Sequence, residues 1–234
     1  MSRHPPTDPE ESSVASPGTV TTEPTRRWSQ AMESAYWDQR YASDDLVWTA
    51  EANRLLMAEA ADLAPGCALD LASGEGRNAM WLAEQGWNVR AVDFSKVATD
   101  KGRRIASARH IDDRIEFESA DLRRHEPGFQ CFDLVVLVYL QIPQADLQPI
   151  IARAAQAVAP GGTFVLVGHD SENLVRGFGG PQSAEMLYTA DQVVASLGGT
   201  LVIEKAHRVE RTIPTPDGQR IALDCLVRAH KPPR

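Results

Sequence analysis

The segment ALDLASGEGRNA, residues 68–79, places an acid and two glycines between an apolar run and a helix-like stretch. Asp70 lies inside the apolar run, and Gly74 and Gly76 follow it. Glycines at a helix start let a ligand approach the backbone, where free N–H groups attract anions. GEGRNA also fits the G-x-G-x-x-G/A dinucleotide pattern. Asp70 opposes that interpretation, because a carboxylate so close would repel a pyrophosphate but would suit an ammonium or sulfonium group.

Two more acids stand where later apolar runs end. Asp93 closes the run NVRAVDF, and Asp121 lies in the run IEFESADL. The carboxyl ends of parallel strands meet at one edge of a sheet, so these acids and Asp70 are expected to converge there. Each also has a purely structural interpretation. Asp70 would satisfy N–H groups of the turn, Asp93 would cap the following helix, and Asp121 would be a solvated loop residue.

Strand-length apolar runs alternate with amphipathic stretches of helix length through the middle of the chain, which predicts an α/β fold with a mostly parallel sheet. The two last strand-like stretches are joined through a Pro-Thr-Pro-Asp-Gly sequence, which indicates an antiparallel hairpin at one edge. The expected strands are 67–72, 88–94, 115–122, 132–140, 163–170, 200–213 and 219–231, and the expected helices after the first strand are 76–86, 95–109, 143–158 and 190–197.

The N-terminal part differs in composition from the rest of the chain. Residues 1–26 are rich in Pro, Ser, Thr and acids, so we expect a disordered tail. One folded domain is expected over 27–234, beginning with a helical cover at about 28–63. Trp37, Tyr41 and Trp48 of this cover either close over a pocket or pack on the core.

Composition limits the class of function. The 234 residues carry a formal charge of −8, which argues against nucleic acid or an anionic membrane as the main partner. No apolar run reaches about 18 residues and no secretion signal is evident, so a cytoplasmic protein is expected. The six His are scattered and no metal-ligand spacing occurs, so no metal site is predicted. Cys67, Cys131 and Cys225 are expected to be buried, reduced thiols.

The order of apolar strand, acid and glycine turn in LDLASGEG resembles the first motif of class I S-adenosylmethionine (SAM)-dependent methyltransferases. VAPGG at 158–162 is similar to that family's turn before its fifth strand, and the terminal hairpin to its last two strands. The resemblance covers roughly residues 30–231. It implies a Rossmann-like three-layer sandwich with a seven-stranded sheet, and the layout is loosely similar to tellurite-resistance and thiopurine-type enzymes.

The resemblance also implies which residues bind the cofactor SAM. Asp93 corresponds to the acid that binds the ribose hydroxyls, and Asp121 to the acid that contacts the adenine amino group. Ala72 stands where the family usually has its first glycine, so the turn is expected to be slightly displaced. The full set of expected cofactor residues is Asp70, Ala72, Gly74, Gly76, Asp93, Phe94, Asp121, Leu122 and Val138.

The methyl acceptor is expected beyond the fourth and fifth strands. Tyr139 follows one of them and His169 the other, where His169 is a candidate general base. Arg176 lies in the glycine-rich segment NLVRGFGGPQ, which either closes as a lid, binds an anionic acceptor, or is a flexible loop. His169, Arg176 and Tyr139 are therefore the catalytic candidates.

The predicted function is transfer of a methyl group from SAM to a small-molecule thiol, hydroxyl, amine or chalcogen oxyanion, by a monomer or homodimer. The alternatives are an NAD(P)-dependent oxidoreductase and a non-catalytic SAM-binding protein.

Overall fold

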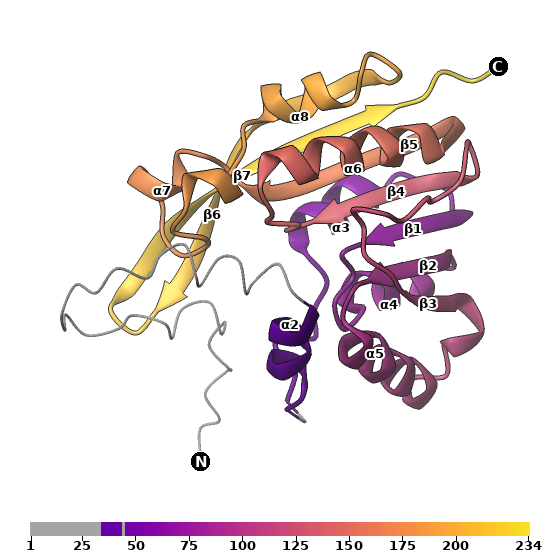
Figure 1. The fold of residues 1–234 in the computed structure, drawn as a ribbon, viewed down its shortest axis with the longest axis horizontal. Helices are drawn as coiled ribbons and strands as arrows, with labels where there is room; N and C mark the ends of the chain where they lie inside the picture. Colours follow the sequence, from indigo (N-terminus) through magenta and orange to yellow (C-terminus); the bar gives the residue numbers. More distant parts are fainter. Residues whose placement is uncertain (1–33, 44) are drawn as a thin grey trace.

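A computed structural model describes residues 34–43 and 45–234. The expected tail at 1–26 lies outside these residues. The described chain forms a seven-stranded sheet with the order β3-β2-β1-β4-β5-β7-β6 (Figure 1). Its strands are β1 Cys67–Leu71, β2 Asn88–Asp93, β3 Ile115–Ser119, β4 Phe132–Val138, β5 Val158–His169, β6 Val202–Thr215 and β7 Gly218–His230.

Strands β1 to β5 are parallel, and β7 is antiparallel to both β5 and β6. The chain runs outward from β1 to β3 and then returns to place β4 on the other side of β1, so the strand order reverses between β1 and β4. Ligands of open α/β sheets bind at the carboxyl ends of the strands at such a reversal. Leu71 pairs with Val92 on one side and with Leu137 on the other, which aligns the ends of β1, β2 and β4 at that edge.

Helices cover both faces of the sheet. Three of them begin at a side chain that accepts a backbone N–H of the first turn, namely Asn53, Ser95 and Thr189. The α-helices are α2 Ser34–Tyr41, α3 Arg54–Ala60, α4 Arg77–Glu84, α5 Lys96–Ala108, α6 Gln144–Ala157, α7 Asn173–Arg176 and α8 Ala190–Ser196. Short 3-10 turns occupy Asp112–Arg114 and Ala184–Met186.

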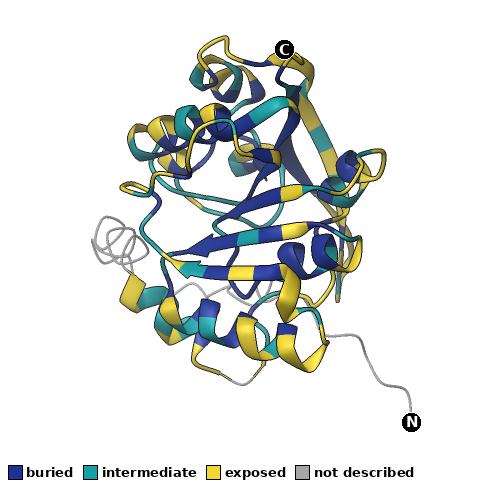
Figure 2. Cartoon of the chain, turned by 90° about the vertical axis from the view of Figure 1, so that its right-hand side faces the viewer, coloured by how far each residue is buried: buried dark blue, intermediate teal, exposed yellow. Residues whose placement is uncertain are grey.

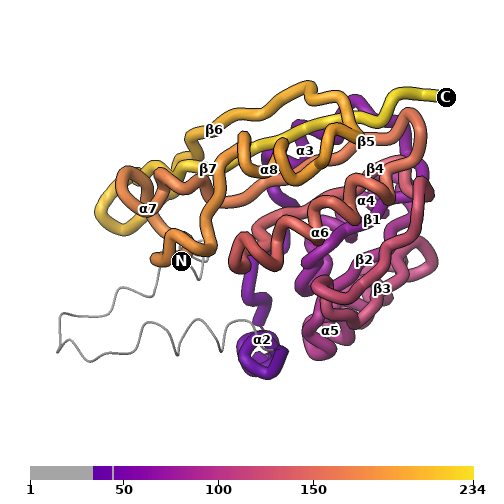
Figure 3. Tube along the Cα trace, turned by 45° about the horizontal axis from the view of Figure 1, so that its top comes forward, coloured from indigo at the N-terminus to yellow at the C-terminus, as the bar shows by residue number. Residues whose placement is uncertain are grey.

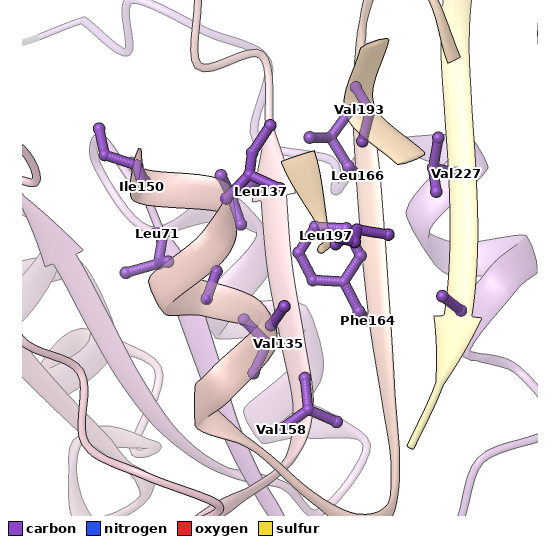
Figure 4. Close-up of a cluster of buried hydrophobic side chains, with 14 of the residues drawn as sticks. Leu71, Val135, Leu137, Ile150, Val158, Phe164, Leu166, Val193, Leu197 and Val227 are labelled. Atoms are coloured by element: carbon purple, nitrogen blue, oxygen red, sulfur yellow. The ribbon is translucent and has the colours of Figure 1, made fainter. Parts of the chain in front are cut away.

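The central strands are apolar at consecutive positions because successive side chains enter two different cores. Val135, Leu137 and Phe164 join α6 and α8 on one face (Figure 4). Leu134 and Val136 join α3, α4 and α5 on the other. Figure 2 shows the resulting layers, with buried strands between helices whose outer sides are exposed. The expected three-layer sandwich is confirmed.

Element boundaries differ from the expected ones mostly by one to three residues. The larger difference is that β5 begins at Val158 and so includes the VAPGG segment predicted as a turn. Val158 pairs with Phe132, and a register shift after Phe132 accommodates the extra residues. The terminal hairpin is confirmed, with Thr215 pairing directly with Gly218 across a turn of two residues.

The prediction of three buried cysteines is wrong for two of them. Cys67 and Cys131 are exposed, while Cys225 is buried; all three are free thiols. Cys67 is the first residue of β1, at the amino end of the strand where the helical layers no longer cover it. Burial raises the pKa of the Cys225 thiol to about 12, so this group stays protonated.

Two features are absent from the described residues. Within 34–43 and 45–234, no helix has the length and apolar character needed to cross a bilayer. In the same residues, no three His, Cys, Asp or Glu side chains come together in a way that would hold a metal ion.

Candidate functional site

The turn after β1 has a left-handed backbone at three positions. Ala72, Gly74 and Gly76 have φ values of 61°, 55° and 83°. Ala72 is the position at which the sequence departs from the family pattern, and a non-glycine residue in this conformation costs on the order of 1–3 kcal/mol. The turn is fastened to β2 by the Ser73 N–H, which donates to the carbonyl oxygen of Val92 at 3.1 Å. Strain at Ala72 is therefore tolerated at the centre of the expected cofactor site.

Asp70 is fully buried at the end of β1. Neither of its carboxylate oxygens makes a hydrogen bond of normal geometry with the described part of the chain. Burial raises the pKa of Asp70 to about 7, and the charge of Asp93 adds to this effect, while Arg77 and the Ala79 N–H oppose it. A buried carboxylate without compensation is costly, and a cationic group brought beside it would remove that cost.

Asp93 is buried at the end of β2 and holds the turn in place. One carboxylate oxygen accepts the N–H of Gly74 at 2.9 Å, and the other accepts the N–H of Ser95 at 2.9 Å. Burial raises the pKa of Asp93 to about 6 despite these two hydrogen bonds. Helix α5 is capped by Ser95 itself, so Asp93 is not the helix cap of the structural interpretation. Each oxygen keeps a second lone pair for a ligand hydroxyl.

Asp121 lies past the end of β3 and is bound by a neighbour. Arg123 Nε and Nη2 donate to the two carboxylate oxygens of Asp121 at 2.9 and 2.7 Å. This pairing is the largest cause of the lowered pKa of Asp121. Ala120 donates its N–H to the carbonyl oxygen of Asp93 at 2.9 Å, which ties this loop to the end of β2. The structure thus brings the three acids to one sheet edge, with Asp121 in a surface ion pair. Phe94 is half-buried there, and Leu122 and Val138 are buried.

The aromatic residues of the N-terminal cover come together beside the glycine turn. The Trp37 ring stacks on Tyr41 at 5.8 Å and lies 6.2 Å from the Trp48 ring. Trp48 Nε1 donates to the Tyr41 hydroxyl at 3.1 Å. A Cβ atom placed on Gly74 would lie 2.9 Å from that hydroxyl, so the turn has room only for glycine here. Helix α2 itself packs against α5 (Figure 3).

A second cluster lies at the ends of β4 and β5, centred on Asp224 of β7. Asp224 is fully buried, and its carboxylate accepts the Tyr139 hydroxyl at 2.9 Å and Arg211 Nε at 2.7 Å. His169 Nδ1 lies 3.2 Å from the other Asp224 oxygen. Burial alone would raise the pKa of Asp224, but the His169 hydrogen bond and the Arg211 charge outweigh it and lower the pKa. Asp224 is therefore an ionised group that orients three side chains.

Tyr139 occupies a strained position in this cluster. Its φ of 56° is left-handed, although it carries a bulky side chain. Such strain gathers at functional sites, where the surrounding structure imposes it. The Tyr139 ring lies 4.8 Å from the His169 ring, and the Arg211 guanidinium lies 5.7 Å from the Tyr139 ring centre. The sequence-predicted residues Tyr139 and His169 are thus brought into contact.

The glycine-rich loop after α7 lies directly on His169. A Cβ atom on Gly180 would stand 2.7 Å from His169 Cδ2. Asn173 holds the loop by donating its side-chain N–H to the carbonyl oxygen of Gly179 at 2.9 Å, while its side-chain oxygen accepts the Leu223 N–H at 2.7 Å. The loop is therefore a cover over His169 that is anchored to β7.

Arg176 does not join the cluster as expected. Its side chain is 67% exposed and pairs with Glu172, one helical turn earlier, at 2.8 Å. Because α7 ends at Arg176 and turns this side chain outward, the guanidinium meets Glu172 instead of the ring of His169. In this structure Arg176 therefore lies outside the His169 cluster, and an anion clamp built from Arg176 and the loop glycines is not formed.

Sequence reasoning missed four charged residues: Glu75, Lys101, Arg211 and Asp224. For Asp224 a signal existed, since RIALDCLV places a single acid inside a buried apolar run, as ALDL does for Asp70. Glu75 stands between two glycines of the turn. Lys101 and Arg211 had no local signal, because exposed basic residues are common on helices and edge strands.

Comparison with known proteins gives the same picture as the geometry. A family described as a methyltransferase domain matches residues 68–162, from β1 to the start of β5. Methyltransferase GfsG of Streptomyces halstedii is 24% identical over 204 residues, which cover 82% of this chain and 73% of GfsG. A tRNA (uracil(54)-C(5))-methyltransferase of Pyrococcus abyssi is 31% identical over 128 residues, which cover 54% of this chain but 28% of that protein.

Two solved structures share the fold. The N-methyltransferase NodS of Bradyrhizobium japonicum, in complex with S-adenosylhomocysteine (SAH), superimposes with a TM-score of 0.64 at 17% identity, over 85% of this chain and 98% of NodS. TehB of Haemophilus influenzae gives a TM-score of 0.64 at 15% identity, over 85% of this chain and 66% of TehB. The fold likeness therefore includes a tellurite-resistance-type protein, as the sequence layout indicated.

The residues at the sheet edge fit SAM. Asp70 offers a buried carboxylate without compensation to a cationic ligand, and Asp93 offers oxygen lone pairs to hydroxyls. A nicotinamide dinucleotide would instead bring negative phosphates beside Asp70. The geometry and the comparisons agree, and the oxidoreductase alternative is set aside: residues 68–162 match a methyltransferase domain, and the chain is a SAM-dependent methyltransferase.

Proposed function

We propose that this methyltransferase acts on a small-molecule nucleophile that carries a proton, such as a thiol, hydroxyl or amine, with His169 as the general base. The observation that carries the proposal is the buried pair of His169 and Asp224 at the sheet edge next to the glycine turn. Leu71 pairs with Leu137, and Val138 pairs with Val167. The ends of β1, β4 and β5 are therefore consecutive along that edge.

The cofactor residues keep the roles that the family resemblance implies. Asp93 binds the ribose hydroxyls, Asp121 and Leu122 contact the adenine, and Phe94 and Val138 form the walls. Asp70 and the backbone of Ala72, Gly74 and Gly76 face the charged end of the cofactor. When bound, SAM supplies a methyl group on a sulfonium sulfur, whose displacement needs no protonation of the leaving group.

The acceptor side of the proposed site moves a proton. Nδ1 of His169 lies against the Asp224 carboxylate, and Nε2, on the other side of the ring, is the atom that we assign to take the acceptor's proton. The negative charge of Asp224 stabilises the imidazolium that forms, and Arg211 keeps Asp224 ionised. Tyr139 is fixed to the same carboxylate and packs its ring against His169.

Access and charge favour a small acceptor over a nucleic acid. His169 is buried under the Gly180 loop, and a base buried in this way is less accessible to a nucleic acid than to a small molecule. The chain carries a formal charge of −8, which opposes contact with a phosphate backbone. The tRNA-modifying relative matches this chain over 28% of its own length.

The test is SAH formation with a panel of thiol, hydroxyl, amine and tellurite acceptors. With an acceptor that turns over, His169→Asn is expected to lower kcat by about 10²–10⁴-fold while the Kd for SAH stays unchanged. His207→Asn is the matched control, because His207 is an exposed histidine on β6. Unchanged kcat in His169→Asn refutes the general-base role. SAH binding with no turnover on any acceptor supports the non-catalytic alternative.

A further inference from the structure

A buried ion pair lies beside the glycine turn and takes no part in the chemistry described above. Lys101 of α5 is 5% exposed, and its Nζ lies 2.7 Å from Glu75 Oε1. The same ammonium group donates to the carbonyl oxygens of Ser43 at 2.8 Å and Asp45 at 2.5 Å. All of its nearby partners are oxygen atoms, from two segments that lie far apart in the sequence.

Glu75 makes the complementary contacts. It stands between Gly74 and Gly76 and is 4% exposed. Its second oxygen, Oε2, accepts the N–H of Val47 at 3.0 Å. The pair of Glu75 and Lys101 therefore joins the glycine turn and helix α5 to Ser43, Asp45 and Val47.

The described residues 42, 43 and 45–53 form no helix or strand of their own, so they depend on contacts of this kind for their position. On their amino-terminal side Tyr41 lies against Gly74, and the nearby charge of Asp93 contributes, after burial, to raising the pKa of Tyr41. Within the stretch, Trp48 donates to the Tyr41 hydroxyl. The segment formed by residues 41–43 and 45–48 thus borders the same backbone and the same carboxylate that the proposed cofactor site uses.

Removal of one partner from a buried ion pair leaves an uncompensated charge and is strongly unfavourable. The ion pair therefore strongly stabilises the arrangement in which the turn and the segment are in contact, relative to any arrangement in which they separate. A ligand that favours the formed turn must favour the docked segment to the same extent, because coupling between two sites is reciprocal.

We propose that Glu75 and Lys101 are positioning residues that latch the segment formed by residues 41–43 and 45–48 onto the glycine turn, so that this segment is a wall of the cofactor site whose docking is coupled to cofactor binding. The proposal concerns the cofactor half of the site and does not depend on the identity of the acceptor. It assigns a function in cofactor binding to residues outside the glycine and acid motifs.

The first test measures the Kd for SAH by calorimetry in Lys101→Met, Glu75→Gln and the double variant. Each single variant is expected to weaken SAH binding by roughly 10–100-fold. The double variant is expected to bind SAH no more weakly than the weaker-binding single variant, because the two substitutions remove the same ion pair. Lys96→Met is the matched control, since it removes an exposed ion pair with Asp100 from the same helix. Single variants that stay folded by circular dichroism and bind SAH within twofold of the unmodified chain overturn the proposal.

The second test uses the unmodified chain and therefore stands even if the variants do not fold. Hydrogen exchange of the Val47 amide, which is bonded to Glu75, is measured with and without saturating SAH. Coupling predicts that SAH slows exchange at Val47 by at least about tenfold, while amides of the β6–β7 hairpin change much less. If SAH slows exchange at Gly74 and leaves Val47 unchanged, the segment is not coupled to the cofactor and the proposal fails.

Discussion

The two halves of the sheet edge differ in how their buried carboxylates are compensated. At the ends of β1 and β2, Asp70 and Asp93 are buried, and the pKa of each is raised. Asp93 accepts two backbone N–H groups, whereas Asp70 makes no hydrogen bond of normal geometry with the described part of the chain. At the carboxyl end of β5, where His169 pairs with Asp224 in the middle of β7, Asp224 is equally buried but is compensated by Arg211 and His169, and its pKa is lowered. Asp170 beside it is bound by Arg208 at 2.8 Å.

This difference reflects what each half has to do. A buried carboxylate without a cation of its own is stabilised when a positively charged ligand arrives, so the β1–β2 half favours binding of such a ligand. A carboxylate already compensated fixes the orientation of its neighbours and stabilises charge that appears during the reaction. Changing one acid on each side should therefore affect different quantities, affinity on one side and rate on the other.

The largest effect on cofactor affinity is expected from Asp93→Ala. The change removes the acceptor of the Gly74 and Ser95 N–H groups and, in the proposed site, that of the ribose hydroxyls. Hydrogen bonds to a charged group contribute about 1.5–3 kcal/mol each, so the Kd for SAH should rise by at least about 100-fold in calorimetry. Asp100→Ala, an exposed acid on α5, is the control. Unchanged affinity in Asp93→Ala would place the cofactor elsewhere.

A smaller effect is expected from Asp70→Asn on SAM binding. Because the pKa of Asp70 is about 7 in the free protein, SAM affinity should fall as pH decreases below 7 and the carboxylate gains a proton. The Asn variant should bind SAM roughly tenfold more weakly at pH 8, and its affinity should depend less on pH. Calorimetry from pH 6 to 8 measures both. Equal pH profiles would contradict a role of Asp70 in attracting the cation.

Asp70→Asn should weaken SAM binding but increase the stability of the cofactor-free protein. Between pH 3.8 and about 7, folded Asp70 holds its proton while the unfolded chain has lost it, so stability falls as pH rises through this window. The neutral Asn side chain escapes this loss. Asp70→Asn should therefore raise the Tm of the cofactor-free protein at pH 8 by at least roughly 2–4 °C, with a smaller difference toward pH 4. A lower Tm at pH 8 would contradict the uncompensated burial of Asp70.

The smallest effect is expected from Arg176→Ala. Its exposed pair with Glu172 contributes about 0.3–0.5 kcal/mol at most, and the side chain points away from the cluster. Turnover should stay within about twofold of the unmodified enzyme. Arg211→Gln, which removes the cation bound to Asp224, should lower kcat by at least about tenfold. A tenfold loss of turnover in Arg176→Ala would instead support the anion clamp that the sequence suggested.

The gathering of the glycine turn and the three acids at one sheet edge was largely predictable from the sequence. An acid at the end of an apolar run and glycines before a helix are features of consecutive residues, and the rule that parallel strand ends share an edge brings them together. The alternation of strands and helices was predictable for the same reason, because hydrophobic period is local. Asp121 was placed correctly along the chain, but its ion pair with Arg123 was not foreseen.

The acceptor half could be predicted only in fragments. Tyr139 and His169 were found because each follows a strand, whereas Asp224, which joins them, lies 85 residues beyond Tyr139. The exposure of Cys67 and Cys131 was missed because an apolar context in the sequence does not tell where the covering helices end.

The sequence by itself determined the elements, the glycine turn and the acids at the strand ends, since each depends on neighbouring residues and on backbone preferences. Only the tertiary structure decided that His169 meets Asp224 and that Glu75 meets Lys101. The first contact follows from the antiparallel return of β7 beside β5, which pairs these two residues in register, and the second from the packing of α5 against the turn. Both depend on how distant segments align, and no local pattern encodes that alignment.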